Sequence, residues 1–136
     1  MLWYINYPES ETKVSSMHNV DFSYPAHLHG CFEMSFCVRG AVDVTVNGEC
    51  RTVLAGYGIL IPAHAVHSYH TADTSEYYTI LFSRGLLPDF TGMFAQSVPE
   101  KYIFPVDESL RRHLLDFSAS ERTVFGGKAF LYRDAE

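Results

Sequence analysis

The stretch HLHGCFE, residues 27–33, carries two histidines and a glutamate, all at odd-numbered positions. In an extended strand successive side chains point to opposite faces, so the segment is predicted to have one polar and one apolar face. The polar face holds His27, His29, Cys31, Glu33, Ser35 and Cys37, and the apolar face holds Phe32, Met34, Phe36 and Val38. If the sheet curls into a small barrel, the polar face lines its interior and the apolar face packs on another sheet, a helix or a partner chain. The alternative is an ordinary polar face in contact with water.

The residues that follow predict a hairpin and further strands. Valines alternate with polar residues over 42–46, before Asn47-Gly48, a dipeptide that tolerates positive φ and favours a tight hairpin turn. The apolar runs GILI (58–61) and YYTILF (77–82) predict two more strands, and turn-forming residues recur between the runs. Such spacing is typical of an antiparallel sandwich or barrel.

The pattern changes to a helical period near the C-terminal end. Leu110, Leu114 and Phe117 recur at i, i+4 and i+7 after Asp107, which is a suitable N-cap. This helix would pack on its own barrel or on a partner helix. A second, weaker helical stretch is predicted from about Thr123 onward.

Length, composition and charge restrict the class of protein. The chain of 136 residues has the size of one domain, and 47% hydrophobic residues suffice for a folded core. Three cysteines without CxxC spacing indicate neither a disulfide framework nor a zinc ribbon. No run approaches the roughly 18 apolar residues of a membrane span, and no secretion signal is recognisable, so a cytoplasmic location is expected. A net charge of -6 without a basic run has the wrong sign for binding DNA.

A second cluster, GYGILIPAHAVHS at residues 56–68, contains a glycine turn, an apolar strand, a proline and then His67. Together with HxHxxxE and Gly40, it resembles the two signature motifs of the cupin superfamily. The resemblance implies a β-barrel that binds one divalent metal through His27, His29, Glu33 and His67. The second motif departs from the family at His64, where the family has glycine, and at Thr71, where it has asparagine. The first departure falls in the turn that would present His67.

A narrower resemblance covers nearly the whole chain. The string from HLHGCFE to HAVHSYH, followed by YYTILFS, LLPDF and FGGKAFLYR, is similar to the N-terminal effector-binding and dimerisation domain of AraC-type transcription regulators. This implies a mostly β fold, a cupin-like double-stranded β-helix (jelly-roll barrel), followed by one or two C-terminal helices. It divides the chain into an N-terminal arm (1–20), the barrel (21–105) and a helical dimerisation region (106–136). The helix-turn-helix domain is absent, so we expect a regulator truncated before its DNA-binding domain.

The resemblance also implies a function. The chain would sense a small molecule, such as a sugar or sugar-like metabolite, would form a homodimer and would not be an enzyme. The effector would order the N-terminal arm or shift the terminal helices, in proportion to its differential affinity for the two arrangements. The apolar segment LWYINY of the arm would fold over a pocket mouth or add an edge strand.

The candidate ligand-binding residues combine the polar cluster with side chains near the predicted mouth. They are His27, His29, Glu33, His67, Tyr24, Arg39, Tyr69 and Tyr78, with Phe22 as a further aromatic candidate. Three imidazoles and one carboxylate suit Zn, Ni, Mn or Fe and leave positions open for water or ligand. Alternatively, the same groups would hydrogen-bond the effector with no metal bound.

A different class of function uses the same residues. A small metal-dependent cupin enzyme, such as a dioxygenase or isomerase, would hold its metal through His27, His29, Glu33 and His67. The helical pattern after the barrel favours the regulator. A purely structural barrel is a third possibility, but it would not require a polar interior.

Overall fold

A computed structural model describes residues 2–5, 14–83 and 103–121. The described strands are β1 (Trp3–Tyr4), β2 (Val14–Val20), β3 (Tyr24–Leu28), β4 (Phe32–Val46), β5 (Glu49–Leu54), β6 (Tyr57–Ile61), β7 (His67–His70), β8 (Ser75–Phe82) and β9 (Ile103–Pro105). The described helix is α2 (Glu108–Glu121). The predicted mostly β fold with a helix after the barrel is therefore confirmed.

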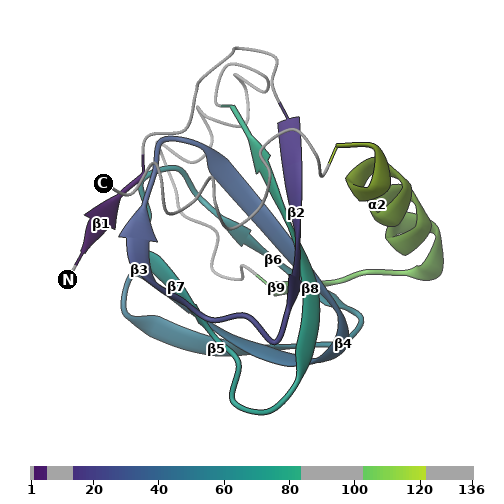
Figure 1. Ribbon diagram of the computed structural model, residues 1–136, viewed down its shortest axis with the longest axis horizontal. Helices are drawn as coiled ribbons and strands as arrows, with labels where there is room; N and C mark the ends of the chain where they lie inside the picture. Colours follow the sequence, from purple (N-terminus) through teal and green to yellow (C-terminus); the bar gives the residue numbers. More distant parts are fainter. Residues whose placement is uncertain (1, 6–13, 84–102, 122–136) are drawn as a thin grey trace.

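Strand β4 joins two layers of the sheet, which curve around a common interior (Figure 1). Its first part pairs with β6 and β8, and its second part pairs with β5 and β7. One layer therefore runs β2-β8-β4-β6-β9, and the other runs β1-β3-β7-β4-β5. The change of partner coincides with Gly40, whose φ is +69° and where a Cβ would lie 2.1 Å from the Thr74 carbonyl oxygen. Only glycine fits so close to another backbone in this conformation.

The strands predicted from the apolar runs are present. Asn47 and Gly48 have φ values of 49° and 87°, as a primed hairpin turn requires, and they connect β4 to β5. The runs 58–61 and 77–82 lie in β6 and β8. Strand β2, which falls within the predicted arm, pairs with β8 along its length, so it forms part of the sheet.

The N-terminal segment takes the edge-strand alternative where it is described. Trp3 and Tyr4 pair in parallel with His27 and Leu28 of β3. The amide of Ile5 donates to the Leu28 carbonyl at 2.9 Å, and its side chain is fully buried. The remainder of the LWYINY segment lies outside the described residues.

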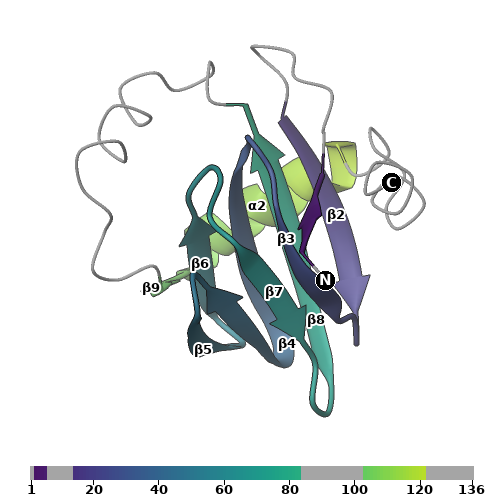
Figure 2. The ribbon, with the colours of Figure 1, turned by 90° about the vertical axis from the view of Figure 1, so that its left-hand side faces the viewer.

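Helix α2 lies along the outer side of the layer that contains β2 and β8 (Figures 1 and 2). It begins as predicted, because Asp107 Oδ1 accepts a hydrogen bond from the Leu110 amide at 2.7 Å. Ser16 on β2 donates to the Ser118 carbonyl of the helix at 3.3 Å. The second helical stretch, predicted from about Thr123, lies outside the described residues. In the part of the chain that is described, no helix has the length and apolarity to cross a membrane.

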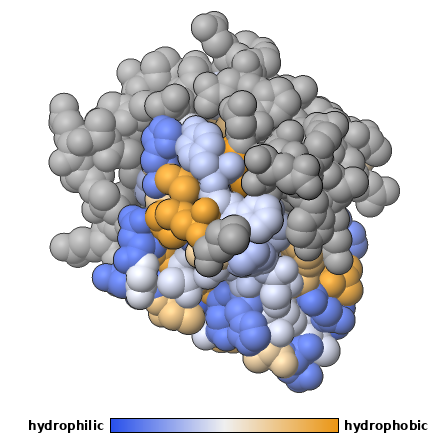
Figure 3. Space-filling model, turned by 60° about the vertical axis from the view of Figure 1, so that its left-hand side comes forward, coloured by the Kyte–Doolittle hydropathy of each residue, from blue (hydrophilic) through white to orange (hydrophobic). Residues whose placement is uncertain are grey.

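The surface is mixed in character. Figure 3 shows one face on which the described atoms are mostly hydrophilic, with a small hydrophobic group beside the grey atoms. The large apolar side chains exposed among the described residues are Leu2, Tyr4, Val20, Leu54, Tyr57 and Leu110. The barrel interior, in contrast, holds both an apolar core and a group of buried ionisable side chains.

Candidate functional site

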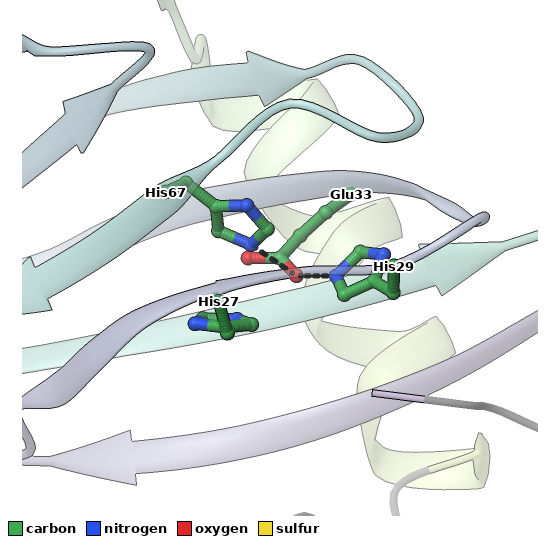
Figure 4. A group of neighbouring side chains, drawn as sticks. All are labelled: His27, His29, Glu33 and His67. Carbon is green, nitrogen blue, oxygen red and sulfur yellow. Dashed lines mark hydrogen bonds and ion pairs between the residues drawn. The ribbon is translucent and has the colours of Figure 1, made fainter. Parts of the chain in front are cut away.

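Four ionisable side chains meet inside the barrel. His27 on β3 lies opposite His67 on β7 in the antiparallel register, His29 follows β3, and Glu33 reaches in from β4. Their ligand atoms all lie within 4.8 Å of one another, and each side chain is at most 2% exposed (Figure 4). The predicted inward polar face therefore brings these four residues together, and we call them the His-Glu cluster.

Each histidine of the cluster is held by a backbone carbonyl. The Nδ1 atoms of His27, His29 and His67 lie 2.8, 3.0 and 2.8 Å from the carbonyl oxygens of residues 25, 31 and 65. A carbonyl oxygen only accepts, so each Nδ1 must carry the hydrogen. Nε2 is then the nitrogen left to bind a metal or a ligand, and the carbonyl fixes the orientation of the ring.

Glu33 is the acidic centre of the cluster. Its Oε1 atom lies 2.9 Å from His29 Nε2 and 3.3 Å from His67 Nε2, and its Oε2 atom accepts a hydrogen bond from the Tyr69 hydroxyl. Burial alone would raise the pKa of Glu33, but the facing His67 and His29 outweigh it and hold this pKa well below its ordinary value. The carboxylate is therefore ionised at neutral pH.

The neighbouring groups respond to burial and to this charge. Burial lowers the pKa of His67, but the Glu33 carboxylate outweighs it, and the pKa is raised overall. Burial, followed by the charge of Glu33, raises the pKa of Tyr69 well above its ordinary value. Burial and the nearby His67 lower the pKa of His27 from 6.5 to about 3, so this ring is neutral at neutral pH.

The donor set fits a divalent transition metal. Bonds of about 2.0–2.2 Å from one ion to imidazole nitrogen and carboxylate oxygen place the ligand atoms roughly 3–4.4 Å apart. The cluster atoms spread over at most 4.8 Å, so a small inward movement would bring them to bonding distance. Three nitrogens and one oxygen suit Zn, Ni, Mn or Fe. The cluster could therefore hold one such metal.

The turn that presents His67 is preserved although it lacks the expected glycine. His64 has a φ of 65°, in the left-handed region that glycine adopts without strain. Its amide donates to the His29 carbonyl at 2.8 Å, which ties this turn to the segment between β3 and β4. The histidine at this position therefore holds a backbone conformation that favours glycine.

A small cavity of about 20 Å³ adjoins the cluster, enough for roughly one water molecule. It is bounded in part by His27 and Glu33 of the cluster. Two further predicted candidates, Tyr24 and Tyr69, also line it, as does Phe22. The Tyr24 ring contacts the His27 ring edge-on, with centroids 4.5 Å apart.

Other residues that line the cavity were not among the predicted candidates. Met17 and Asn19 come from β2, and Tyr77 and Thr79 come from β8. The alternation along YYTILF could have indicated that Tyr77 and Thr79 share a face. Sequence gave no corresponding signal for β2, because its register depends on pairing with a strand about sixty positions away, as in Met17 opposite Thr79.

Two predicted candidates lie away from the cluster. The Arg39 side chain is 51% exposed and its Nε lies 3.5 Å from Glu76 Oε1. An irregularity in the β4–β8 register between Cys37 and Arg39 breaks the alternation that would have turned Arg39 inward. Tyr78 points to the outer face of β8, where its ring stacks on His18 and Phe36 with centroids 4.6 and 5.2 Å away.

Three solved structures illustrate the general similarity in fold. The plu4264 protein from Photorhabdus luminescens is 19% identical, with a TM-score of 0.48, and the match covers 65% of this chain and 78% of that chain. An RmlC-like cupin from Shewanella frigidimarina is 19% identical, with a TM-score of 0.44 and coverage of 49% and 65%. A putative mannose-6-phosphate isomerase from Ralstonia eutropha is 14% identical, with a TM-score of 0.46 and coverage of 52% and 74%. The match thus spans just under two thirds of the Shewanella protein, and none of these similarities is close enough to indicate a ligand or an activity.

Comparison with curated proteins finds no matching sequence. The sequence does match a protein family described as the AraC-like ligand binding domain, over residues 14–120. The match runs from the start of β2 nearly to the end of α2, and so includes the His-Glu cluster, the cavity and the helix. It covers well over half of the chain, and the chain therefore belongs to the family of AraC-like ligand binding domains.

Proposed function

We propose that this chain is the effector-sensing domain of an AraC-type transcription regulator, and that its effector binds in the barrel beside the His-Glu cluster. Membership of the ligand-binding family supports the sensing role. The further proposals are a sugar or sugar-like effector, a homodimer in the cytoplasm, and DNA binding through a separate helix-turn-helix domain. The observation that carries the choice of site is the burial of three histidines and a glutamate around one point.

We propose in addition that the cluster holds one divalent metal. When bound, the metal would supply a Lewis-acidic position for an oxygen or nitrogen of the effector. The chain's own residues provide the rest of the site. The carbonyls at 25, 31 and 65 orient the imidazoles, and Glu33 supplies the compensating negative charge.

Strand β2 offers a route from the site to the helix. Met17 and Asn19 line the cavity, whereas Ser16, the residue before Met17, donates to the Ser118 carbonyl of α2. A ligand that displaces β2 would therefore act directly on the contact between β2 and helix α2. It can shift the helix only to the extent that it binds the two arrangements with different affinities.

The proposal is tested by measuring metal and effector binding together. We expect purified wild-type chain to contain about one metal ion and to be stabilised by sugars or related metabolites in a thermal-shift screen. The double variant His27→Ala/His29→Ala should lose about 100-fold or more in metal affinity while keeping its fold, because two of four ligands are gone. A control, His18→Ala/His70→Ala, removes two histidines outside the cluster and should bind normally. Unchanged metal and effector binding in the first variant would contradict the assignment.

A metal-dependent cupin enzyme remains the second candidate, because four protein ligands leave positions on the ion open for a substrate. The same purified protein distinguishes the two functions. Stabilisation by a compound that is recovered unchanged supports the sensor. Conversion of that compound, in proportion to the metal content, supports the enzyme.

A further inference from the structure

A continuous run of hydrogen bonds leads away from the cluster along the cavity wall. The Tyr69 hydroxyl bonds to Glu33 Oε2, and Ser35 Oγ lies 2.7 Å from the Tyr69 oxygen. Ser35 Oγ also lies 2.9 Å from Thr79 Oγ1, and Asn19 Nδ2 lies 3.2 Å from that same Thr79 oxygen. These residues, at most 8% exposed, come from β7, β4, β8 and β2. We call Asn19, Thr79, Ser35 and Tyr69 the polar chain.

The direction of every hydrogen bond in the polar chain follows from its two ends. Tyr69 donates its single hydrogen to the carboxylate oxygen Oε2 of Glu33. Ser35 must then donate to Tyr69, and Thr79 must donate to Ser35, because each hydroxyl has one hydrogen. The Asn19 amide nitrogen can only donate, and it completes the chain at Thr79.

This direction determines what the wall can offer a ligand. The three hydroxyl hydrogens are all used, within the polar chain or on Glu33, and the second N–H of Asn19 lies toward the Tyr77 carbonyl at 3.3 Å. The hydroxyl oxygens of Tyr69 and Thr79, which line the cavity, keep a lone pair each, and Asn19 keeps its carbonyl oxygen. His27, whose Nδ1 hydrogen is held by the carbonyl of residue 25, also presents an acceptor nitrogen. The polar side of the cavity therefore offers acceptors.

The charges of the residues that line the cavity also favour a ligand that donates hydrogen bonds. Among the described residues that border the cavity there is no lysine or arginine, and the nearest full charge is the Glu33 carboxylate. A carboxylate or phosphate brought to this wall would meet lone pairs and a negative charge. It would have to lose its hydration without gaining a donor, which is costly in a buried site.

We infer that, in the metal-free chain, this wall selects ligands that present a hydroxyl or amino hydrogen-bond donor and disfavours carboxylate and phosphate groups. The inference rests on the proposed function, since it specifies the ligand of the same barrel. The free volume of about 20 Å³ admits one hydroxyl- or amino-sized group. Met17, an unbranched and adaptable side chain that also borders the cavity, is the residue that can make room for the rest of a larger ligand.

The test uses three probes of nearly equal size with the full chain, freed of metal by a chelator so that no ion attracts the anion. Ethylene glycol and ethanolamine bring donors, and glycolate brings a carboxylate. We expect the two donors to raise Tm by about 5 °C at about ten times their Kd. Calorimetry should show glycolate binding about tenfold more weakly or not at all.

Two variants locate the effect in the polar chain. Thr79→Val removes an acceptor and releases an N–H of Asn19, so the preference for donors over glycolate should fall by about tenfold. Ser15→Ala is the matched control, because Ser15 is a buried hydroxyl on β2 that has no hydrogen-bond partner among the described residues. It should keep the wild-type preference, and the Tm of each unliganded variant reports whether the fold is intact.

Several results would overturn the inference. They are glycolate binding as tightly as ethanolamine, no binding by either class, or an unchanged preference in Thr79→Val. None of these results affects metal binding or its loss in His27→Ala/His29→Ala. The ligand-class inference and the proposed function can therefore fail independently.

Discussion

Glu33 and Phe36 lie on opposite faces of strand β4, and they are 2% and 1% exposed. The inner residue, Glu33, accepts a hydrogen bond from the Tyr69 hydroxyl and lies 2.9 and 3.3 Å from the Nε2 atoms of His29 and His67. The outer residue, Phe36, has no polar group to satisfy and stacks on Tyr78 at a centroid distance of 5.2 Å. Two side chains that are almost equally buried are therefore stabilised in two different ways. The outer face gains stability from apolar contact, whereas the inner face keeps charge in the interior by pairing it, as a binding site requires.

The largest loss of stability is expected when a charge is placed on the apolar outer face of β4. Phe36→Asp removes a buried ring, which costs about 3–5 kcal/mol, and buries a carboxylate without a partner. Together these costs approach the whole net stability of a small domain, about 5–15 kcal/mol. We expect no cooperative unfolding transition when the variant is heated and followed by circular dichroism.

Leu54→Asp is the control for that experiment, because Leu54 is 53% exposed and takes the same change of charge. It should melt close to the wild type. A native melting curve for Phe36→Asp would mean that the outer face is not packed, and the contrast between the faces would fail.

Lowering the pH should instead destabilise the folded chain through the ionisable side chains of the inner face. The pKa of His27 is about 3 in the folded chain and 6.5 in its ordinary state, so between these pH values the unfolded chain binds a proton that the folded chain does not. Stability of the metal-free protein should therefore fall as pH falls from 6.5 toward 3, by about 1.4 kcal/mol per pH unit for one proton. Urea unfolding with a chelator present measures this slope, and His27→Gln should reduce it.

The other two titrating groups act in different pH windows. Because the pKa of His67 is raised, its contribution is present below its ordinary pKa and is lost as pH rises through the folded value. Because the pKa of Glu33 is lowered, its contribution is present above its ordinary pKa and is lost as pH falls through the folded value. A loss of stability below pH 4.5 that His27→Gln leaves intact would therefore be assigned to Glu33 rather than to His27.

The inner face was more predictable from sequence than its surroundings. Alternation along residues 27–37 depends only on strand geometry, and it correctly places Glu33 and Ser35 inside. Arg39 breaks the pattern because the register shifts, and such an irregularity has no signature in the local sequence. Asn19 and Thr79 meet through strand pairing over about sixty residues, which a local pattern cannot specify. The helix start at Asp107 was predictable because capping is local.

A milder change sharpens the comparison by removing one inner hydrogen bond. Tyr69→Phe leaves Glu33 Oε2 without the phenol donor, so the carboxylate is less well oriented toward the histidines. Loss of such an outer partner typically lowers metal affinity by about 10–100-fold. Competition with a chromophoric chelator gives the Kd. Tyr77→Phe, which loses a hydrogen bond to the Phe22 carbonyl instead, should retain nearly wild-type affinity, and equal losses in both variants would contradict a specific role for Tyr69.

The smallest expected effect concerns the turn that delivers His67 to the inner face. His64 is exposed and contributes its amide to the His29 carbonyl, so its side chain should matter less than its backbone angle. With φ at 65°, glycine relieves a strain of about 1–2 kcal/mol but gives back about 0.5–1 kcal/mol through the greater freedom of the unfolded chain. Alanine keeps the strain, so urea midpoints should show His64→Gly more stable than His64→Ala by about 1 kcal/mol, with equal metal affinity. If alanine were the more stable substitution, the turn would not be left-handed, and the inner face would owe the placement of His67 to contacts other than this turn.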